Sequence, residues 1–294
     1  MCRFVAYLGK EVLLSDIIKK PKHSLVRQSY EAKERISPIN ADGFGVGWYV
    51  PEISDEPCLF TSITPAWGNR NLDRISSKTK SGCIFAHVRA ATSDLAVTAL
   101  NCHPFQYKNM LWMHNGQIGE FEKVKHALVK TLRKEYFNLI QGTTDSEILF
   151  ALFLNALHSN IKNPSDKDIE NALIKCVQIT VKICAKLKIK EPCVLNLCVT
   201  NGQSIFTTRF VNSNKRKPAS LYYLDKGALR FTKTTCKAGP LKKDEEKHQA
   251  VVASEPITLG RTYWKSVPAN TLVSIGSDLE PSLRPIKILK SEFV

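Results

Sequence analysis

Short apolar runs alternate with turn-forming residues through the first third of the chain. Each run is rich in β-branched or aromatic residues and is bounded by Gly, Pro, Asn or Asp, a pattern that predicts strands. We therefore expect this part to contribute several short strands. The runs are RFVAYL (3–8), GFGVGWYV (43–50), CIFAHVRAAT (83–92) and MLWMHNGQI (110–118).

The middle of the chain changes to a helical period. Apolar residues recur there at spacings of three and four, as they do on one face of an α-helix. The pattern predicts helices in this part of the chain. The segments that follow it are 120–140, 144–157 and 168–187.

The final third returns to strand-like sequence. Residues 192–210 predict a hairpin around Asn201-Gly202, because both positions tolerate a positive φ. Residues 221–233 predict a second hairpin around Lys226-Gly227. Strands, then helices, then strands favour an α+β layered domain of antiparallel sheets over alternating βαβ units. No segment is long and polar enough to require a second unit, so residues 2–294 are expected to form one domain.

The chain is strongly basic, with a formal charge of +15 over 294 residues. Such a charge can attract nucleic acid, a membrane surface or an anionic substrate. The lysines are spread through predicted helices and loops, and no helix-turn-helix, zinc-finger or RNA-binding signature occurs. We therefore expect a solvated basic surface and no nucleic-acid partner. A basic pocket mouth would favour an anionic peptide as substrate.

The cysteines and the apolar runs indicate in which cellular compartment the protein is expected. The nine cysteines include no C-x-x-C pair, and Cys83, Cys184 and Cys198 lie in apolar runs, which suits reduced thiols. The longest apolar run, ILFALFLNAL, is far below the ~20 residues that span a bilayer. Gly9 and Lys10 interrupt the apolar start that a secretory signal would need. We expect a cytoplasmic protein without membrane contact.

The second residue of the chain is a cysteine. Removal of Met1 would leave Cys2 with a thiol and a free α-amino group on the same residue. An α-amino group has a pKa near ~7.7–8.0, so part of it can accept a proton at neutral pH. Cys2 could therefore be a nucleophile that carries its own base. The alternative is a small buried side chain at the start of a first strand.

Arg89 follows the apolar run that contains His87. An arginine at a strand end is usually a surface residue, but its planar fork of donors can also bind a carboxylate. The small neighbours Ala90, Ala91 and Thr92 would leave room for a ligand. His87 itself is expected to be a hydrogen-bonded core residue.

Asn115-Gly116 follows another apolar run and could be a tight hairpin turn. It could also form an oxyanion hole, with the Asn115 amide and the Gly116 backbone N–H directed at a developing negative oxygen. In GTTDSE, Thr144 or Asp145 could cap the next helix. The Asp145 carboxylate could also bind a substrate ammonium, which together with Arg89 would recognise the head group of an amino acid.

In this order, behind an N-terminal cysteine, these stretches resemble the class II glutamine amidotransferases. Those enzymes are N-terminal-nucleophile hydrolases, whose catalytic cysteine is the first residue of the mature chain. The resemblance runs from residue 2 to about 256. Its stretches are MCRFVAYLG, NADGFGVGWY, FAHVRAAT, NCHPF, MHNGQI, GTTDSE and VVASEP.

The resemblance implies a four-layer αββα sandwich of two antiparallel sheets. The implied catalytic residues are Cys2, Asn115 and Gly116, and the implied substrate-binding residues are Arg89, Asp145, His103 and Thr92. No metal or organic cofactor is implied, and Cys102-His103 lacks the paired spacing of a zinc site.

Three stretches indicate which members of this family the chain resembles most. KPKHSLVRQSY, CLFTSITPAW and NCHPF are similar to the amidotransferase-like subunit of the eukaryotic glutathione-degrading complex. The γ-glutamyl hydrolase of ergothioneine biosynthesis is a similar stand-alone enzyme. Both imply cleavage of a γ-glutamyl amide such as that of glutathione, and the first implies a peptidase partner subunit. SDLAVTAL after AHVRAAT departs from relatives that carry a glycine there, which puts the local loop and its specificity in doubt.

Two other functions remain open at this point. The chain could be a glutaminase subunit that supplies ammonia to a separate synthase, in which case the synthase would raise its glutaminase activity. It could also be an inactive scaffold whose basic surface docks an acidic partner. Retention of Cys2, Arg89, Asn115, Gly116 and Asp145 argues against a scaffold, which does not need them all.

Overall fold

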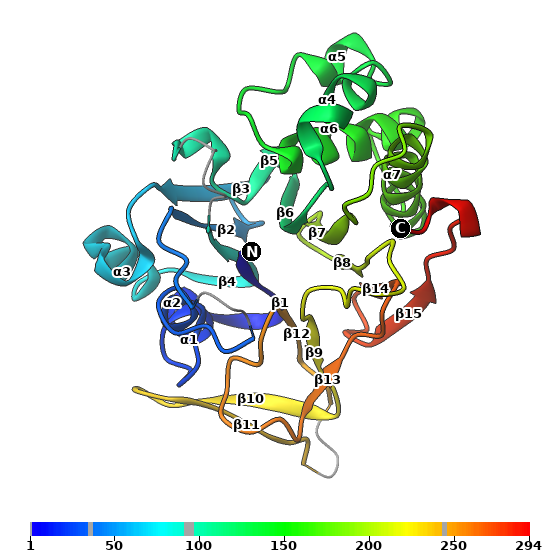
Figure 1. Cartoon of the computed structure of the whole chain (residues 1–294). Helices are drawn as coiled ribbons and strands as arrows, with labels where there is room; N and C mark the ends of the chain where they lie inside the picture. Colours follow the sequence, from blue (N-terminus) through cyan, green and yellow to red (C-terminus); the bar gives the residue numbers. More distant parts are fainter. Residues whose placement is uncertain (1, 35–37, 91–96, 243–245) are drawn as a thin grey trace.

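Two antiparallel sheets lie face to face in the computed structural model, which describes residues 2–34, 38–90, 97–242 and 246–294 (Figure 1). The first sheet has the order β13 (Trp264–Ser266), β9 (Tyr222–Leu224), β12 (Gln249–Ala253), β1 (Arg3–Leu13), β4 (Lys80–Val88), β2 (Phe44–Val50), β3 (Ser54–Ser62). The second has the order β15 (Pro281–Pro285), β14 (Thr271–Ile275), β8 (Ile205–Arg209), β7 (Val194–Thr200), β6 (Met110–Gln117), β5 (Phe105–Tyr107).

Helices cover the outer face of each sheet (Figure 1). The first sheet carries α1 (Leu14–Ile18), α2 (Leu25–Gln28) and α3 (Arg70–Ser76). The second carries α4 (Phe121–Val129), α5 (Lys134–Phe137), α6 (Asp145–Leu157) and α7 (Asp166–Lys186). The short helical turns are Ala66–Gly68, Ala99–Asn101, His158–Asn160 and Lys290–Glu292. The predicted α+β sandwich of the αββα type is confirmed.

In strand β1, residues 4–8 form a continuous apolar run. Successive side chains of a strand point to opposite faces. Phe4 and Ala6 enter the core between the sheets, whereas Val5 and Tyr7 enter the core beneath the helices. Both faces are buried, so the strand reads as a continuous apolar run rather than an alternating one.

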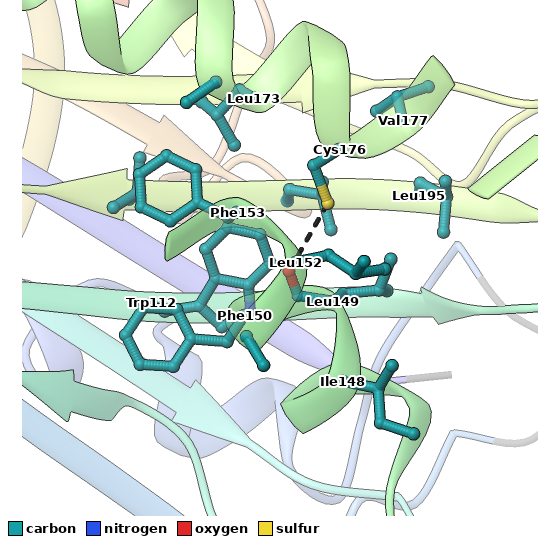
Figure 2. Packing of buried hydrophobic residues seen from close by; sticks show 14 of the residues in the cluster. Trp112, Ile148, Leu149, Phe150, Leu152, Phe153, Leu173, Cys176, Val177 and Leu195 are labelled. Atoms are coloured by element: carbon teal, nitrogen blue, oxygen red, sulfur yellow. Dashed lines mark hydrogen bonds between the residues drawn. The ribbon is translucent and has the colours of Figure 1, made fainter. Parts of the chain in front are cut away.

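The helical layer over the second sheet packs around aromatic side chains (Figure 2). Trp112 of β6 stacks on Phe150 and lies against Phe153, both of α6, with ring centroids 5.4 Å apart in each pair. The Cys176 thiol of α7 donates to the Leu149 carbonyl at 3.3 Å (Figure 2). These contacts join α6, α7 and the second sheet.

Two of the predicted elements are wrong in detail. The single helix expected over 120–140 is divided into α4 and α5, because the Thr131 hydroxyl donates to the Leu128 carbonyl and the Arg133 amide donates to Asn155. The hairpin around Asn201-Gly202 is confirmed, since β7 pairs with β8. The second hairpin does not form: β9 pairs with β12 and β13, and β10 (Gly227–Phe231) pairs instead with β11 (Cys236–Pro240).

The beginning of β1 and the ends of β4 and β12 lie at the same end of the first sheet. Arg3, the first residue of β1, pairs with Val88, the last residue of β4. Cys2 and Arg89, the residues just beyond these ends, therefore lie side by side. The neighbouring strand β12 also ends at this edge, which brings Ser254 there.

We predict that Phe153→Ala destabilises the fold strongly, because Phe153 is 0% exposed and its loss would open a cavity beside Trp112. The expected cost is ~3–5 kcal/mol, measured by chemical unfolding. Phe137→Ala is the matched control, since Phe137 is 50% exposed and should change stability by less than ~0.5 kcal/mol. Equal effects of the two substitutions would contradict this description of the core.

Candidate active site

A pocket of about 580 Å³ opens where β1 begins and where β4 and β6 end. The beginnings of α4 and α6 complete its walls. Its inner residues are Cys2, Arg89, Ala90, His103, His114, Gly116, Ile118, Phe121, Thr144, Asp145 and Ser146. Its more exposed residues are Gln117, Glu120, Glu122, Lys123 and Glu191. The pocket thus contains Cys2, Arg89, His103, Gly116 and Asp145 from the predicted set, while Thr92 lies outside the described residues.

Cys2 is half-buried and is held by the backbone beyond β4. The Ala90 amide donates to Sγ at 3.4 Å, and Sγ lies 3.7 Å from the Ala90 carbonyl oxygen. The side chain belongs to the same strand face as Phe4 and Ala6, so it points to the space between the sheets. This direction places the thiol in the pocket rather than against the outer helices.

Arg89 and Asp145 bring opposite charges to this pocket. Arg89 is 3% exposed and donates from Nη1 to the Asp42 carbonyl at 3.4 Å. Asp145 begins α6, where its Oδ2 accepts the Ile118 amide at 2.8 Å. The N-cap is Thr144, whose hydroxyl accepts the Glu147 amide, so capping does not account for Asp145. This pair of opposite charges among the inner residues is complementary to a ligand that carries both a carboxylate and an ammonium.

Asn115-Gly116 is not a hairpin turn. Both residues lie within β6, paired with Asn196 and Leu195 of β7. A Cβ on Gly116 would approach the Val194 carbonyl oxygen to 1.8 Å, so only glycine fits there. Gly116 lines the pocket, whereas the fully buried Asn115 amide faces the space between the sheets and donates to the Ser254 hydroxyl at 3.4 Å.

Two buried imidazoles, His103 and His114, line the pocket, and a third, His87, lies beside His103. The His103 ring stacks on Phe105 at 4.3 Å and lies 4.4 Å from the His87 ring. Burial, and then the nearby His87, His114 and Arg89, hold the pKa of His103 well below its usual range. Burial likewise lowers the pKa of His87 to about 3 and lowers that of His114. The three rings are therefore neutral near pH 7, and neither nitrogen of His103 has a partner in the described parts of the chain.

The more exposed wall of the pocket is acidic rather than basic. It carries Glu120, Glu122 and Glu191 against Lys123. The hydrogen bond from Lys123, with the amides of residues 190 and 191, lowers the pKa of Glu120 to about 2, so this carboxylate is ionised. The described part of the pocket does not provide the basic mouth expected from the net charge. No motif singles out Glu191, which lies in the segment before β7.

Ser254 and Glu255, both within VVASEP, were not among the predicted site residues. The Ser254 hydroxyl accepts the Phe4 amide at 3.0 Å and so connects β1 to Asn115. Glu255 is 1% exposed and forms an ion pair with the fully buried Arg3 at 2.6 Å. These two residues lie directly behind the nucleophile candidate.

Among the described residues, no three His, Cys, Asp or Glu side chains are arranged to hold a metal ion. Within the same part of the chain, no helix has the length and apolar character required to cross a bilayer.

Comparison with known proteins defines the class. Residues 15–279 match the family described as glutamine amidotransferases class-II, and the chain belongs to this family. It is an enzyme of that class. A curated relative, probable glutamine amidotransferase DUG3 of Saccharomyces cerevisiae, is 37% identical over 94% of this chain and 82% of its own. A gamma-glutamyl-hercynylcysteine sulfoxide hydrolase of Mycolicibacterium smegmatis is 32% identical over 57% of this chain and 70% of its own.

Solved structures agree on the fold. A glutamine aminotransferase class-II domain protein from Silicibacter pomeroyi superposes with a TM-score of 0.64 at 24% identity, covering 97% of this chain and 99% of that one. Glutamine phosphoribosylpyrophosphate amidotransferase of B. subtilis gives a TM-score of 0.56 at 14% identity, covering 97% of this chain and 49% of that one. At these identities the likeness establishes the architecture alone.

We predict that Gly116→Ala disrupts this edge of the pocket, because the added Cβ would force β6 away from the Val194 carbonyl. The expected loss of stability is at least ~1–3 kcal/mol, accompanied by loss of activity. Gly68→Ala is the control, since nothing lies within 4 Å of a Cβ built there. A Gly116→Ala protein with the melting temperature and activity of the wild type would contradict the close approach of Gly116 to the Val194 carbonyl.

We predict a pH-dependent contribution to stability from Glu255. Burial alone would raise the pKa of this carboxyl, but the hydrogen bond from His23, the charge of Arg3 and two backbone amides together lower it to about 2. The unfolded chain, with its value near 4.5, then binds the proton more readily. The contribution is complete above pH 4.5 and is lost as the pH falls towards 2. The stability difference between wild type and Glu255→Gln, measured from pH 5 to 2, should shrink across this interval. A constant difference would refute the assignment.

Proposed function

We propose that this enzyme hydrolyses γ-glutamyl amides through Cys2, which becomes the N-terminal residue once Met1 is removed. The observation that carries the proposal is the placement of the Cys2 thiol in one pocket with Arg89, Asp145 and Gly116. The family match supports the class of chemistry. We also propose that residues 2–294 act as one amidotransferase domain.

The first half of the reaction forms a thioester. The α-amino group of Cys2, directly or through a water molecule, accepts the thiol proton as Sγ attacks the δ-carbonyl of the γ-glutamyl group. The tetrahedral oxyanion accepts hydrogen bonds from the Gly116 N–H and the Asn115 amide, each such donor being worth ~10²–10³ in rate. The C–N bond breaks, and the leaving amine takes the proton. A γ-glutamyl thioester on Cys2 remains.

The second half of the reaction releases glutamate. The α-amino group accepts a proton from water as its oxygen attacks the thioester carbonyl. The same two donors stabilise the second oxyanion. Collapse expels the thiol and restores Cys2, so neither a metal nor an organic cofactor takes part.

Two charged inner residues of the pocket are proposed to bind the glutamyl head group. Arg89 binds the α-carboxylate through its guanidinium fork, and Asp145 binds the α-ammonium. His103, a neutral ring with both nitrogens available, contributes a polar contact at the pocket floor. Thr92 is proposed as a fourth contact on the basis of its sequence position alone.

We propose a γ-glutamyl peptide such as glutathione as the substrate. The pocket volume is within the ~300–1,000 Å³ of ordinary ligand sites, so a leaving group larger than ammonia can be accommodated. A relative named as a gamma-glutamyl-hercynylcysteine sulfoxide hydrolase supports an amide other than that of glutamine. A peptidase subunit that consumes the released dipeptide is the proposed partner.

We predict that glutamate is released from glutathione faster than from glutamine, and that Cys2→Ala abolishes release because no nucleophile remains. Glutamate is quantified by coupled assay with each substrate, after mass spectrometry has verified loss of Met1. Cys58→Ala is the matched control, since Cys58 is the exposed cysteine outside the pocket and should retain full activity.

Different outcomes separate the alternatives. Release chiefly from glutamine, raised by a synthase subunit, would identify an ammonia supplier instead. Release that persists in Cys2→Ala would refute the thioester mechanism. No release from either substrate by the processed protein would contradict the activity of the isolated chain and support the scaffold.

A further inference from the structure

Arg3, the residue next to the proposed nucleophile, is completely buried yet does not line the pocket. Its side chain belongs to the opposite face of β1 from Cys2, with Val5 and Tyr7. An arginine in such a place requires a partner for its charge and acceptors for its donors. The residue therefore influences the pocket only through the main chain.

The guanidinium of Arg3 has three acceptors at once. Nε donates to Glu255 Oε1 at 2.6 Å, and Nη2 donates to the Glu34 carbonyl at 2.9 Å. Nη1 donates to the carbonyl of Cys2 itself at 2.9 Å. One planar group thus joins the nucleophile's own peptide unit to a fixed carboxylate.

Glu255 is held firmly enough to serve as that fixed point. Besides Arg3, its carboxylate accepts the His23 Nε2–H at 2.7 Å and the amides of Lys33 and Glu34 at 2.9 and 3.0 Å. Four donors saturate the two oxygens, which makes burial of this anion tolerable. The carboxylate is 252 residues from Arg3 in the sequence, so the tertiary fold alone brings them together.

An N-terminal residue is unusually free, because no preceding peptide unit restrains it. For Cys2, rotation about the Cα–C bond would swing the α-amino group and the thiol together, since both are attached to Cα. The hydrogen bond from Arg3 to the Cys2 carbonyl holds the peptide plane, and with it the Cα–C bond about which this rotation occurs, while the Ala90 amide holds Sγ at 3.4 Å. On the other side, the Phe4 amide is held by Ser254. The main chain at residues 2–4 is therefore fastened from both faces of the strand.

We propose that Arg3, anchored by Glu255, is a positioning residue that sets the orientation of the Cys2 amine and thiol for attack. This inference rests on the function proposed above. A displacement of about 1 Å at a reacting group can cost ~10²-fold in rate. Loss of the contact should therefore lower kcat and leave KM nearly unchanged, because Arg89 and Asp145 still bind the head group.

Arg3→Lys separates this role from a merely structural ion pair. Lysine keeps the positive charge next to Glu255, but its compact ammonium cannot serve the three acceptors that the planar fork reaches. We expect kcat to fall ~10–100-fold with KM within about threefold of wild type. Glu170→Gln is the matched control, because Glu170 is a little-exposed carboxylate paired with Arg284 on the far helical layer. Its loss should affect melting temperature alone.

A second readout does not require turnover. The pH dependence of Cys2 alkylation by iodoacetamide, followed on the N-terminal peptide, reports how well the amine assists the thiol. We expect slower alkylation in Arg3→Lys and a profile shifted towards that of an unstructured N-terminal cysteine peptide. If the wild type shows no amidohydrolase activity, the proposed function fails, and this profile still decides the positioning role.

Unchanged kcat and an unchanged alkylation profile in a folded Arg3→Lys protein would overturn the proposal. Parallel changes of kcat and KM with an unchanged alkylation profile would also overturn it, by indicating a general disturbance of the pocket. If Arg3→Lys does not fold, Glu255→Asp provides the same measurements, since it keeps the charge but withdraws the carboxylate by one methylene. The same criteria then apply to that variant.

Discussion

The pairing of β1 with β4 on one side and β12 on the other is the interaction on which the site depends. It places the beginning of β1 beside the end of β4, so Cys2 lies next to Arg89 and Ala90. Burial of both faces of β1 fixes its register, because a shift by one residue would exchange the side chains of its two cores. The position of the thiol is thus a consequence of the packing of the whole sandwich.

The second sheet supplies the rest of the pocket from a different layer. The end of β6 brings Gly116 close to β7, and the Asp145 carboxylate fastens the beginning of α6 to the backbone after β6. A positive side chain from the end of β4 and a negative one from the beginning of α6 therefore face one cavity. In the proposed function, this separation lets the pocket bind both ends of a small zwitterionic head group, with the Cys2 sulfur between them.

Local sequence was sufficient for the elements with a strong period and for motifs at strand ends. The αββα class, β7–β8 and the grouping of Cys2, Arg89 and Asp145 could be predicted from the residues and their resemblance. The division of the helix at 130–133 could not, since it depends on a bond from Arg133 to the distant Asn155. Likewise, β10 resembled the second arm of a hairpin, but its partner is the later strand β11. The acidic wall of the pocket and the contacts of Glu255 join residues that are far apart in the sequence, so local patterns could not predict them.

The central claim is that Cys2 reacts as a free N-terminal nucleophile, and intact-mass analysis tests it most directly. The protein is treated with a glutamine analogue that carries an electrophilic diazoketone in place of the side-chain amide, and the adduct is mapped. The account predicts a mass without Met1 and one adduct on Cys2 among the nine cysteines, with the exposed Cys58 unmodified. An adduct on another cysteine, or labelling of a chain that retains Met1, would contradict it.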